Sequence, residues 1–109
     1  MSYLVHLSTE TEKNRDQAYQ YYLERSPQGA HRWFTSYEKA IFALISDPHR
    51  YAVARENDNF SAKLQQINFG TKLSRPTHRL IFYVEERTVY VVTLRHLHQQ
   101  DWQPQGPLT

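Results

Sequence analysis

The last third of the chain decides its fold: it reads KLQQINFG at 63–70, THRLIFYV at 77–84 and TVYVVTLRHLHQ at 88–99. The second and third segments are rich in Val, Ile, Tyr and Phe, which favour β-strands. Only the polar turn Glu85-Glu86-Arg87 separates them. We therefore expect an antiparallel hairpin, in which the start of one strand lies opposite the end of the other.

Each of these two strands carries an arginine beside a histidine. His78 and Arg79 begin the first strand, and Arg95 and His96 end the second. Hairpin geometry predicts that the two pairs are neighbours in space. Because side chains alternate along a strand, at most two of the four face one side unless a twist or bulge intervenes. Such side chains on a rigid ribbon suit contact with phosphate or general acid/base chemistry.

The first 25 residues predict a strand followed by a helix. Residues 3–7 alternate apolar and polar side chains well enough for a short strand. Ser8 and Thr9 offer an N-cap, and Thr9 with Glu12 matches the S/T-x-x-E capping box. We therefore expect a helix from about residue 10 to residue 25.

A second helix follows directly. Ser26-Pro27 both ends the first helix and starts the next, and Asp47-Pro48 ends the second. Apolar residues recur between them at spacings of three and four, which predicts one buried stripe. The aromatic members of this stripe are expected in the core: Trp33, Phe34 and Tyr37. So short a connection predicts an antiparallel helical hairpin.

The predicted order is β-α-α-β-β-β, an α+β fold with a helical hairpin on one face of a small, mainly antiparallel sheet. The strand expected at about 62–69 alternates imperfectly, which predicts a bulge or an edge position. The other face of the sheet is expected to be free as a working surface. Residues 1–100 are expected to form one domain, and residues 101–109 an irregular tail that Trp102 can pin.

Charge is unevenly distributed along the chain. Residues 1–60 hold seven Lys/Arg against eight Asp/Glu, and residues 61–109 hold six against three, so the balances are −1 and +3. The positive strand region suits a polyanion or an acidic partner, or serves solubility alone. With 39% hydrophobic and 22% charged residues, the chain is expected to be soluble, with no membrane partner. The absence of cysteine excludes disulfides and thiol catalysis and fits a reducing cytoplasm.

Several segments together resemble the RelE/ParE superfamily, the toxins of bacterial type II toxin–antitoxin pairs, also called plasmid stabilisation proteins. The segments are YYL-x-x-S after the first helix, I-x-x-L-x-x-x-P at the end of the second, KLQQINFG, HRLIFYV and VYVVTLRHLHQ. The resemblance covers about residues 3–100. It rests on the collinear set rather than on any single motif.

The resemblance implies a toxin domain of the RelE/ParE-like fold, acting in the cytoplasm and neutralised by a cognate antitoxin that wraps around it. RelE-like members cleave mRNA in the ribosome, using basic residues and often a C-terminal Tyr or His. ParE-like members lack the full catalytic set and poison DNA gyrase, and a degenerate member would only bind its antitoxin. The resemblance implies no cofactor.

Carried over residue by residue, the resemblance assigns roles in the strand region. Arg79 matches the arginine that stabilises charge on the scissile phosphate in RelE-like enzymes, with His78 before it. His96 and His98 lie near the place of the C-terminal Tyr or His and are the other catalytic candidates. Substrate binding is expected from His78 and from four cations: Lys63, Lys72, Arg75 and Arg95.

Other interpretations fit the same residues. Arg79 can form a structural ion pair with Glu56 or Glu85, and His78 can be an exposed strand residue. His96 and His98 form an H-x-H pair, but no third metal ligand has suitable spacing, so no metal site is expected.

Two features of the sequence bear on the choice between mRNA cleavage and gyrase poisoning. Gln65 stands where the family commonly has a cation, which weakens the nuclease interpretation. The Arg-His ending followed by Gln resembles ParE-like members at least as much as it resembles RelE-like nucleases.

Metal-free RNA cleavage needs a base, an acid and cations around the phosphorane. Tyr83 and Tyr90 are the strand aromatics that suit base stacking, although strand tyrosines usually pack.

Overall fold

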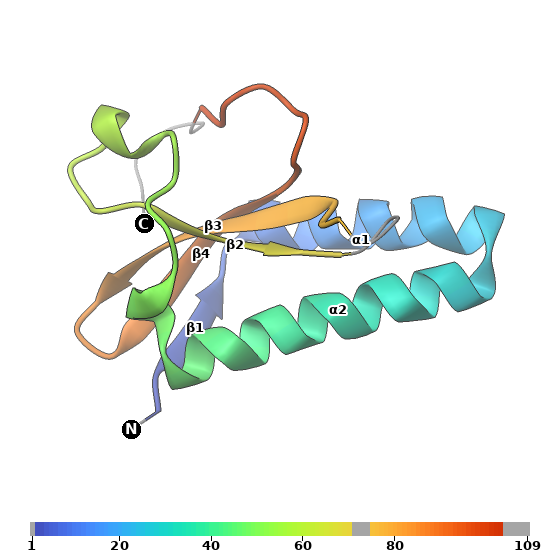
Figure 1. Cartoon of the computed structure of the whole chain (residues 1–109), viewed down its shortest axis with the longest axis horizontal. Helices are drawn as coiled ribbons and strands as arrows, with labels where there is room; N and C mark the ends of the chain where they lie inside the picture. The colour runs from blue at the N-terminus through green and yellow to red at the C-terminus, as the bar shows by residue number, and fades with distance from the viewer. Residues whose placement is uncertain (1, 71–74, 104–109) are drawn as a thin grey trace.

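The computed structural model describes residues 2–70 and 75–103, which form an α+β fold of two helices and a four-stranded mixed sheet (Figure 1). The elements in chain order are β1 (Leu4–Leu7), α1 (Thr9–Arg25), α2 (Pro27–Ser46), the 3-10 turns η1 (Pro48–Arg50) and η2 (Asn57–Asn59), β2 (Gln65–Phe69), β3 (His78–Glu85) and β4 (Thr88–His96). This order agrees with the order expected from the sequence.

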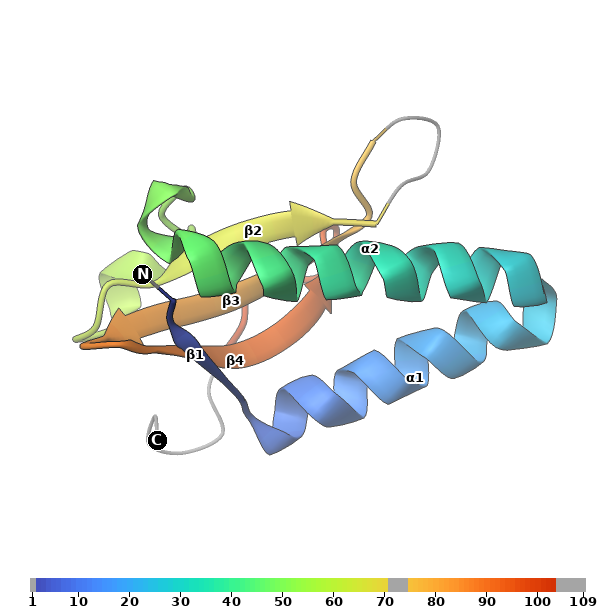
Figure 2. The same ribbon diagram turned by 90° about the horizontal axis from the view of Figure 1, so that it is seen from below.

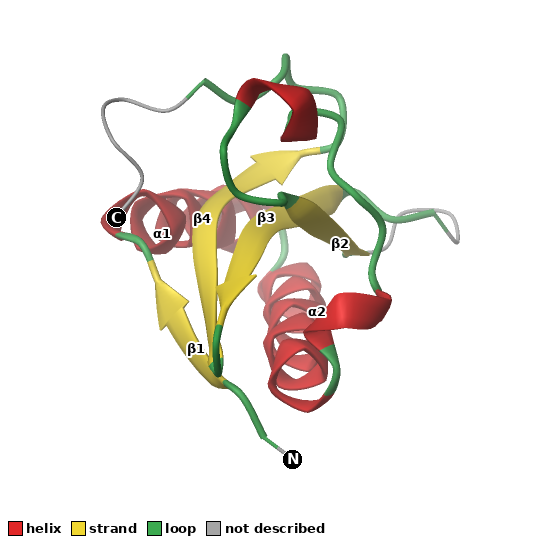
Figure 3. Cartoon of the chain, turned by 90° about the vertical axis from the view of Figure 1, so that its left-hand side faces the viewer, coloured by secondary structure: helices red, strands yellow, loops and turns green. Residues whose placement is uncertain are grey.

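The strands lie in the order β1-β4-β3-β2, as Figure 3 shows. β1 runs parallel to β4, and the other neighbours are antiparallel. β2 is an edge strand, one of the two predicted alternatives, although it begins at Gln65 rather than near residue 62. The hairpin of β3 and β4 turns through Glu86 and Arg87, with Glu86 at a φ of 55°.

The two helices form the expected antiparallel hairpin on one face of the sheet (Figure 2). Ser26 serves both: its N–H donates to Tyr22 O at 2.8 Å, and its Oγ accepts from Gly29 N–H at 3.0 Å. The capping box expected at Thr9 is wrong, because Ser8 is the N-cap of α1. Ser8 Oγ also donates to Val92 O at 2.8 Å, and this bond fastens the start of α1 to β4.

The main core lies between α2 and the sheet. The predicted stripe supplies one side of it, with Trp33 and Tyr37 each 4% exposed. The sheet supplies Phe69, Leu80 and Phe82 among others, and Trp33 lies 5.7 Å from Phe69 between ring centroids. Burial of each large apolar side chain contributes about 1.5–3 kcal/mol, so this layer is the principal source of stability.

A β-bulge interrupts the hairpin. Ile81 pairs with Thr93 and Phe82 pairs with Val91, so Val92 has no partner on β3. Strict alternation along β4, as the sequence predicted it, therefore fails at this point: Val91 and Leu94 both face the helices while Val92 faces the other side.

The sheet face away from the helices is covered, and its predicted role as a free working surface is wrong. A second buried cluster occupies it: Ala54, Leu64, Ile81, Tyr83, Val92 and Trp102. The loop between α2 and β2 and the segment after β4 cross this side, opposite α2 (Figure 1). Trp102 anchors the segment after β4, and Tyr83 and Tyr90 stack on each other with centroids 5.1 Å apart.

Gly70 is the first residue after β2, and its replacement by alanine should destabilise the fold. Its φ is 76°, and an added Cβ would lie 2.2 Å from Thr77 Oγ1. The left-handed backbone costs a non-glycine residue about 1–2 kcal/mol, and the displaced threonine adds to this. We expect Gly70→Ala to lower the free energy of unfolding, measured by urea denaturation, by about 2 kcal/mol or more.

Gly29→Ala is the matched control. Gly29 lies in the first turn of α2, where the nearest atoms to an added Cβ are 3.4 Å away, and alanine favours the helix. This variant should be as stable as the wild type or slightly more stable. Equal stability of both variants would show that the turn at Gly70 tolerates a side chain.

Candidate functional site

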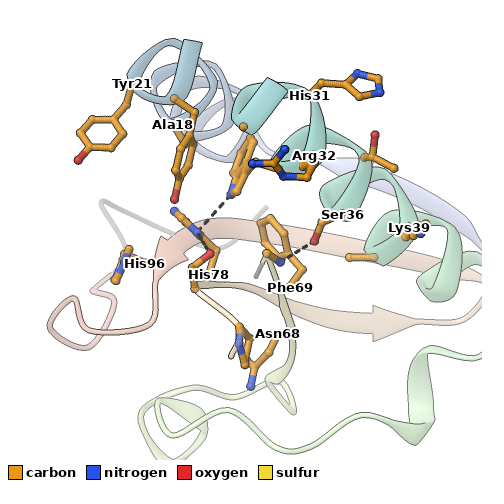
Figure 4. A pocket seen from close by; sticks show the side chains of 18 of the residues that line it. Ala18, Tyr21, His31, Arg32, Ser36, Lys39, Asn68, Phe69, His78 and His96 are labelled. Atoms are coloured by element: carbon orange, nitrogen blue, oxygen red, sulfur yellow. Dashed lines mark hydrogen bonds between the residues drawn. The ribbon is translucent and has the colours of Figure 1, made fainter. Parts of the chain in front are cut away.

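The helical hairpin extends past the end of the sheet (Figures 1 and 2). Residues of the two helices and of the strand ends together line a groove of about 1400 Å³. One wall comes from the C-terminal half of α1 and from α2, and the other from the ends of β2, β3 and β4. Figure 4 shows how side chains from both walls face this space. The polar and aromatic lining residues that matter below are Tyr21, Arg25, His31, Arg32, Trp33, Lys39, Arg75, His78 and His96.

The lining of the groove is basic. It includes Arg25, Arg32, Lys39 and Arg75 together with three histidines, and no described residue that lines it is an aspartate or glutamate. Arg32 and Lys39 are seven positions apart on α2 and so lie on one side of that helix. Low-dielectric walls that carry one sign of charge focus the field in a cleft, so this groove attracts anions.

His78 forms part of the sheet wall and is 6% exposed. Its Nδ1 accepts a hydrogen bond from Trp33 Nε1–H at 3.2 Å, and the Thr77 hydroxyl lies 2.7 Å from the same nitrogen. Burial and, to a smaller extent, the charge of the neighbouring His96 together lower the pKa of His78 to about 4. His78 is therefore neutral at pH 7, and it is buried rather than exposed on its strand.

His96 lies directly opposite His78, as the hairpin geometry predicted. The two ring centroids are 5.0 Å apart, and both rings line the groove. His98 is exposed in the turn after β4, with its ring 5.3 Å from that of His96 and its N–H donating to His96 Nδ1 at 3.2 Å. The predicted meeting of His78 with His96 is thus confirmed, whereas His98 lies beside His96 and is not among the residues that line the groove.

Arg79 does not line the groove, which corrects its predicted contact with phosphate. Its side chain is fully buried on the opposite face of the sheet, where it forms an ion pair with Glu56. Arg79 Nη1 donates to Glu56 Oε1 at 2.8 Å and to Gln66 Oε1 at 2.9 Å. The structural ion pair considered from the sequence is thus present, and Arg79 has no exposed surface for a ligand.

The remaining predicted cations are dispersed. Arg75 lines the groove, whereas Lys63 is exposed at the opposite end of β2. Arg95 lies opposite Arg79, away from the groove lining, and donates to Gln100 O at 2.7 Å. Lys72 lies outside the described residues.

Gln65 is a buried structural residue. It is 1% exposed, and its amide Nε2 donates to the carbonyls of Pro48 and Tyr51 at 3.2 and 2.9 Å. A neutral amide satisfies these buried carbonyls without the desolvation cost of a charge. Gln65 therefore fastens the loop after α2 to β2.

The sequence reasoning missed the helical half of the site. Arg25, His31, Arg32 and Lys39 lie on helices that had been assigned to packing alone. The spacing of Arg32 and Lys39 on the polar side of α2 was visible in the sequence. What was not visible was that this side faces the ends of β2, β3 and β4.

Comparisons with known proteins do not assign the chain to a family. No protein-family model and no curated protein matches the chain. Among the described residues, no group of three His, Cys, Asp or Glu could hold a metal ion, and no helix is long and apolar enough to cross a membrane. The functional assignment therefore depends on the groove and on the sequence motifs.

The ion pair of Glu56 and Arg79 should dominate the response of the fold to mutation. Replacement of Glu56 by glutamine leaves the guanidinium buried without its counter-charge, which costs about 3–5 kcal/mol for a buried pair. We expect Glu56→Gln to reduce the free energy of unfolding by about that amount in urea denaturation. Asp101→Asn, which breaks the exposed pair with Arg55, should cost less than about 1 kcal/mol.

The same pair sets a dependence of stability on pH. Burial alone would raise the pKa of Glu56, but hydrogen bonds from Arg79 and Trp102 N–H and the charge of Arg79 lower it overall. A lowered carboxyl pKa contributes stability that is complete above the unfolded value, about 4.3, and is lost as the pH falls toward the folded value. The stability difference between wild type and Glu56→Gln should therefore narrow from pH 6 to pH 3. A constant difference would contradict this.

Proposed function

We propose that this chain is a toxin of the RelE/ParE superfamily, held inactive in the cytoplasm by a cognate antitoxin, and that it cleaves mRNA in the ribosome. The basic groove, whose described lining residues include no carboxylate, with histidines in and beside it, is the observation that carries the proposal. The sequence segments that resemble the family and the order of the helices and strands agree with it.

RNA cleavage without a metal needs cations for the phosphate and groups that exchange protons, and the groove and its edge offer candidates for both. Arginines bind phosphate oxygens through paired N–H donors, and Arg32 and Arg75 are exposed at the groove for this role. His96 and His98 are the groups for proton exchange with the leaving 5′ oxygen and the 2′-OH. In this proposal the groove cations replace Arg79, which is buried in its ion pair.

An exposed aromatic ring beside the groove favours a single-stranded substrate. Tyr21 is 53% exposed and lines the groove, and the guanidinium of Arg25 lies 3.5 Å from its ring centroid. Proteins that bind single strands combine a basic groove with aromatic rings on which bases stack. Tyr21 takes the stacking role considered for Tyr83 and Tyr90, which pack against each other.

The burial of Arg79 favours a second candidate, a ParE-like inhibitor of DNA gyrase without catalysis. An arginine sealed in an ion pair cannot stabilise a phosphorane, so the residue that the family uses for this purpose is not free. In this alternative the groove binds its target without reaction. A member that binds only its antitoxin is the remaining alternative.

Induction of the chain in bacterial cells separates these candidates. Translation arrest with cleavage of ribosome-bound mRNA supports the nuclease, whereas DNA damage with filamentation supports the gyrase inhibitor. We expect Arg75→Glu to abolish the arrest and to weaken binding of single-stranded RNA roughly tenfold, since it replaces a phosphate contact by repulsion.

Lys63→Glu is the matched control, because it makes the same charge change at an exposed lysine outside the groove. It should remain toxic and bind RNA like the wild type. An equal loss of toxicity and RNA binding in both variants would show that the RNA-binding surface is not confined to the groove. Normal growth on induction of the wild type would exclude both toxin activities.

A further inference from the structure

The imidazole of His78 is fixed in one tautomer by its neighbours. An indole N–H can only donate, so Nδ1 of His78 must accept from Trp33. The Thr77 hydroxyl lies 2.7 Å from the same nitrogen, and as a donor it shares the single lone pair of Nδ1 with Trp33. A neutral ring that accepts at Nδ1 carries its proton on Nε2, which is therefore a donor with no lone pair for a proton.

The surroundings of His78 keep this ring neutral. The aromatic groups packed around it are Tyr22 from α1, Trp33 from α2, Phe69 from β2 and His96 from β4. Only Tyr22 and His96 among them titrate, and neither brings a negative charge near neutral pH. No carboxylate among the described lining residues is available to stabilise an imidazolium.

The Nε2–H of His78 donates to no described residue, and this nitrogen is not one of the buried side-chain atoms that lack a partner. It is therefore accessible from the groove that His78 lines, where it can donate to a bound ligand. An anionic acceptor fits best, because the cations of the lining include Arg32 and Arg75.

We propose that His78, positioned by Trp33, is a fixed N–H donor to a phosphate group of single-stranded RNA bound in the groove. The choice of RNA rests on the proposed function, whereas the donor role rests on the hydrogen bonds of His78. Four cations spread over α1, α2 and the loop before β3 match a string of phosphates better than one carboxylate. His78 therefore binds the RNA backbone, and His96 and His98 carry out the proton exchange.

Nuclear magnetic resonance of the imidazole nitrogens tests the tautomer directly. In the full-length protein, two-bond proton–nitrogen spectra should show His78 protonated at Nε2 and unprotonated at Nδ1 at every pH from 5.5 to 8. Trp33→Phe, which removes one donor to Nδ1, should allow the other tautomer or a rise in protonation at the low end of that range. Protonation of Nδ1 in the wild type would overturn the proposal.

Two probes then test the ligand. Titration with inorganic phosphate and, separately, with a ten-nucleotide oligouridylate should both move the His78 Nε2 signal. A response to phosphate without a response to the oligonucleotide would overturn the assignment to RNA. No response to either would overturn the phosphate subsite itself.

Two variants of His78 separate the donor from the packing. His78→Phe keeps an aromatic ring without a donor and should weaken oligouridylate binding roughly tenfold, the usual effect of losing a hydrogen bond to a charged group. His78→Gln places an amide N–H near Nε2 and should recover part of that loss. Lys13→Ala, at an exposed lysine of α1 outside the groove, should change affinity less than about twofold. Equal affinities for folded His78→Phe and wild type would overturn the proposal.

Failure of this inference differs from failure of the proposed function. If induction of the wild type leaves cells growing normally while phosphate and oligouridylate still move the His78 signal, the donor role stands and the toxin assignment falls. If induction arrests translation and neither probe moves that signal, the toxin assignment stands and the inference falls.

Discussion

The buried ion pair of Glu56 and Arg79 holds together parts of the chain that would otherwise lie apart. Arg79 belongs to β3, Glu56 to the loop before η2, and the backbone N–H of Trp102 donates to Glu56 Oε2 at 2.7 Å. Trp102 in turn donates to Glu10 in α1 and stacks on Phe60. One carboxylate therefore links the central sheet, the long loop and the C-terminal segment, which together close the second core.

This pair also explains why neighbouring residues have different roles. His78 and Arg79 are consecutive on β3 and so face opposite sides of the sheet. The arginine is turned into the second core by its acid partner, and the histidine is turned into the groove beneath the helices. A charge that stays buried must be paired, which commits Arg79 to the fold and leaves ligand binding to the other face.

The sequence predicted the parts that local chemistry controls. The ends of α2, the hairpin of β3 and β4 and the meeting of His78 with His96 follow from caps, prolines and strand pairing. The bulge at Val92 and the covered second face did not follow, because both depend on contacts made by the loop and the C-terminal segment. Arg79 was ambiguous from the sequence because a buried arginine is recognised by its partner, and Glu56 lies 23 positions away.

The candidate site exists because the helical layer is longer than the sheet that it covers. Because the helical hairpin extends past the sheet, side chains near its tip have no strand beneath them, and the ends of β2, β3 and β4 form the opposite wall (Figures 2 and 4). The sequence analysis named Arg75, His78 and His96 in the strand region. It did not name the three helical cations that line the same groove, which are Arg25, Arg32 and Lys39. The positive field thus arises from the two layers jointly. No lining residue that the structure describes carries a carboxylate, so that field acts on a bound anion rather than on the protein itself.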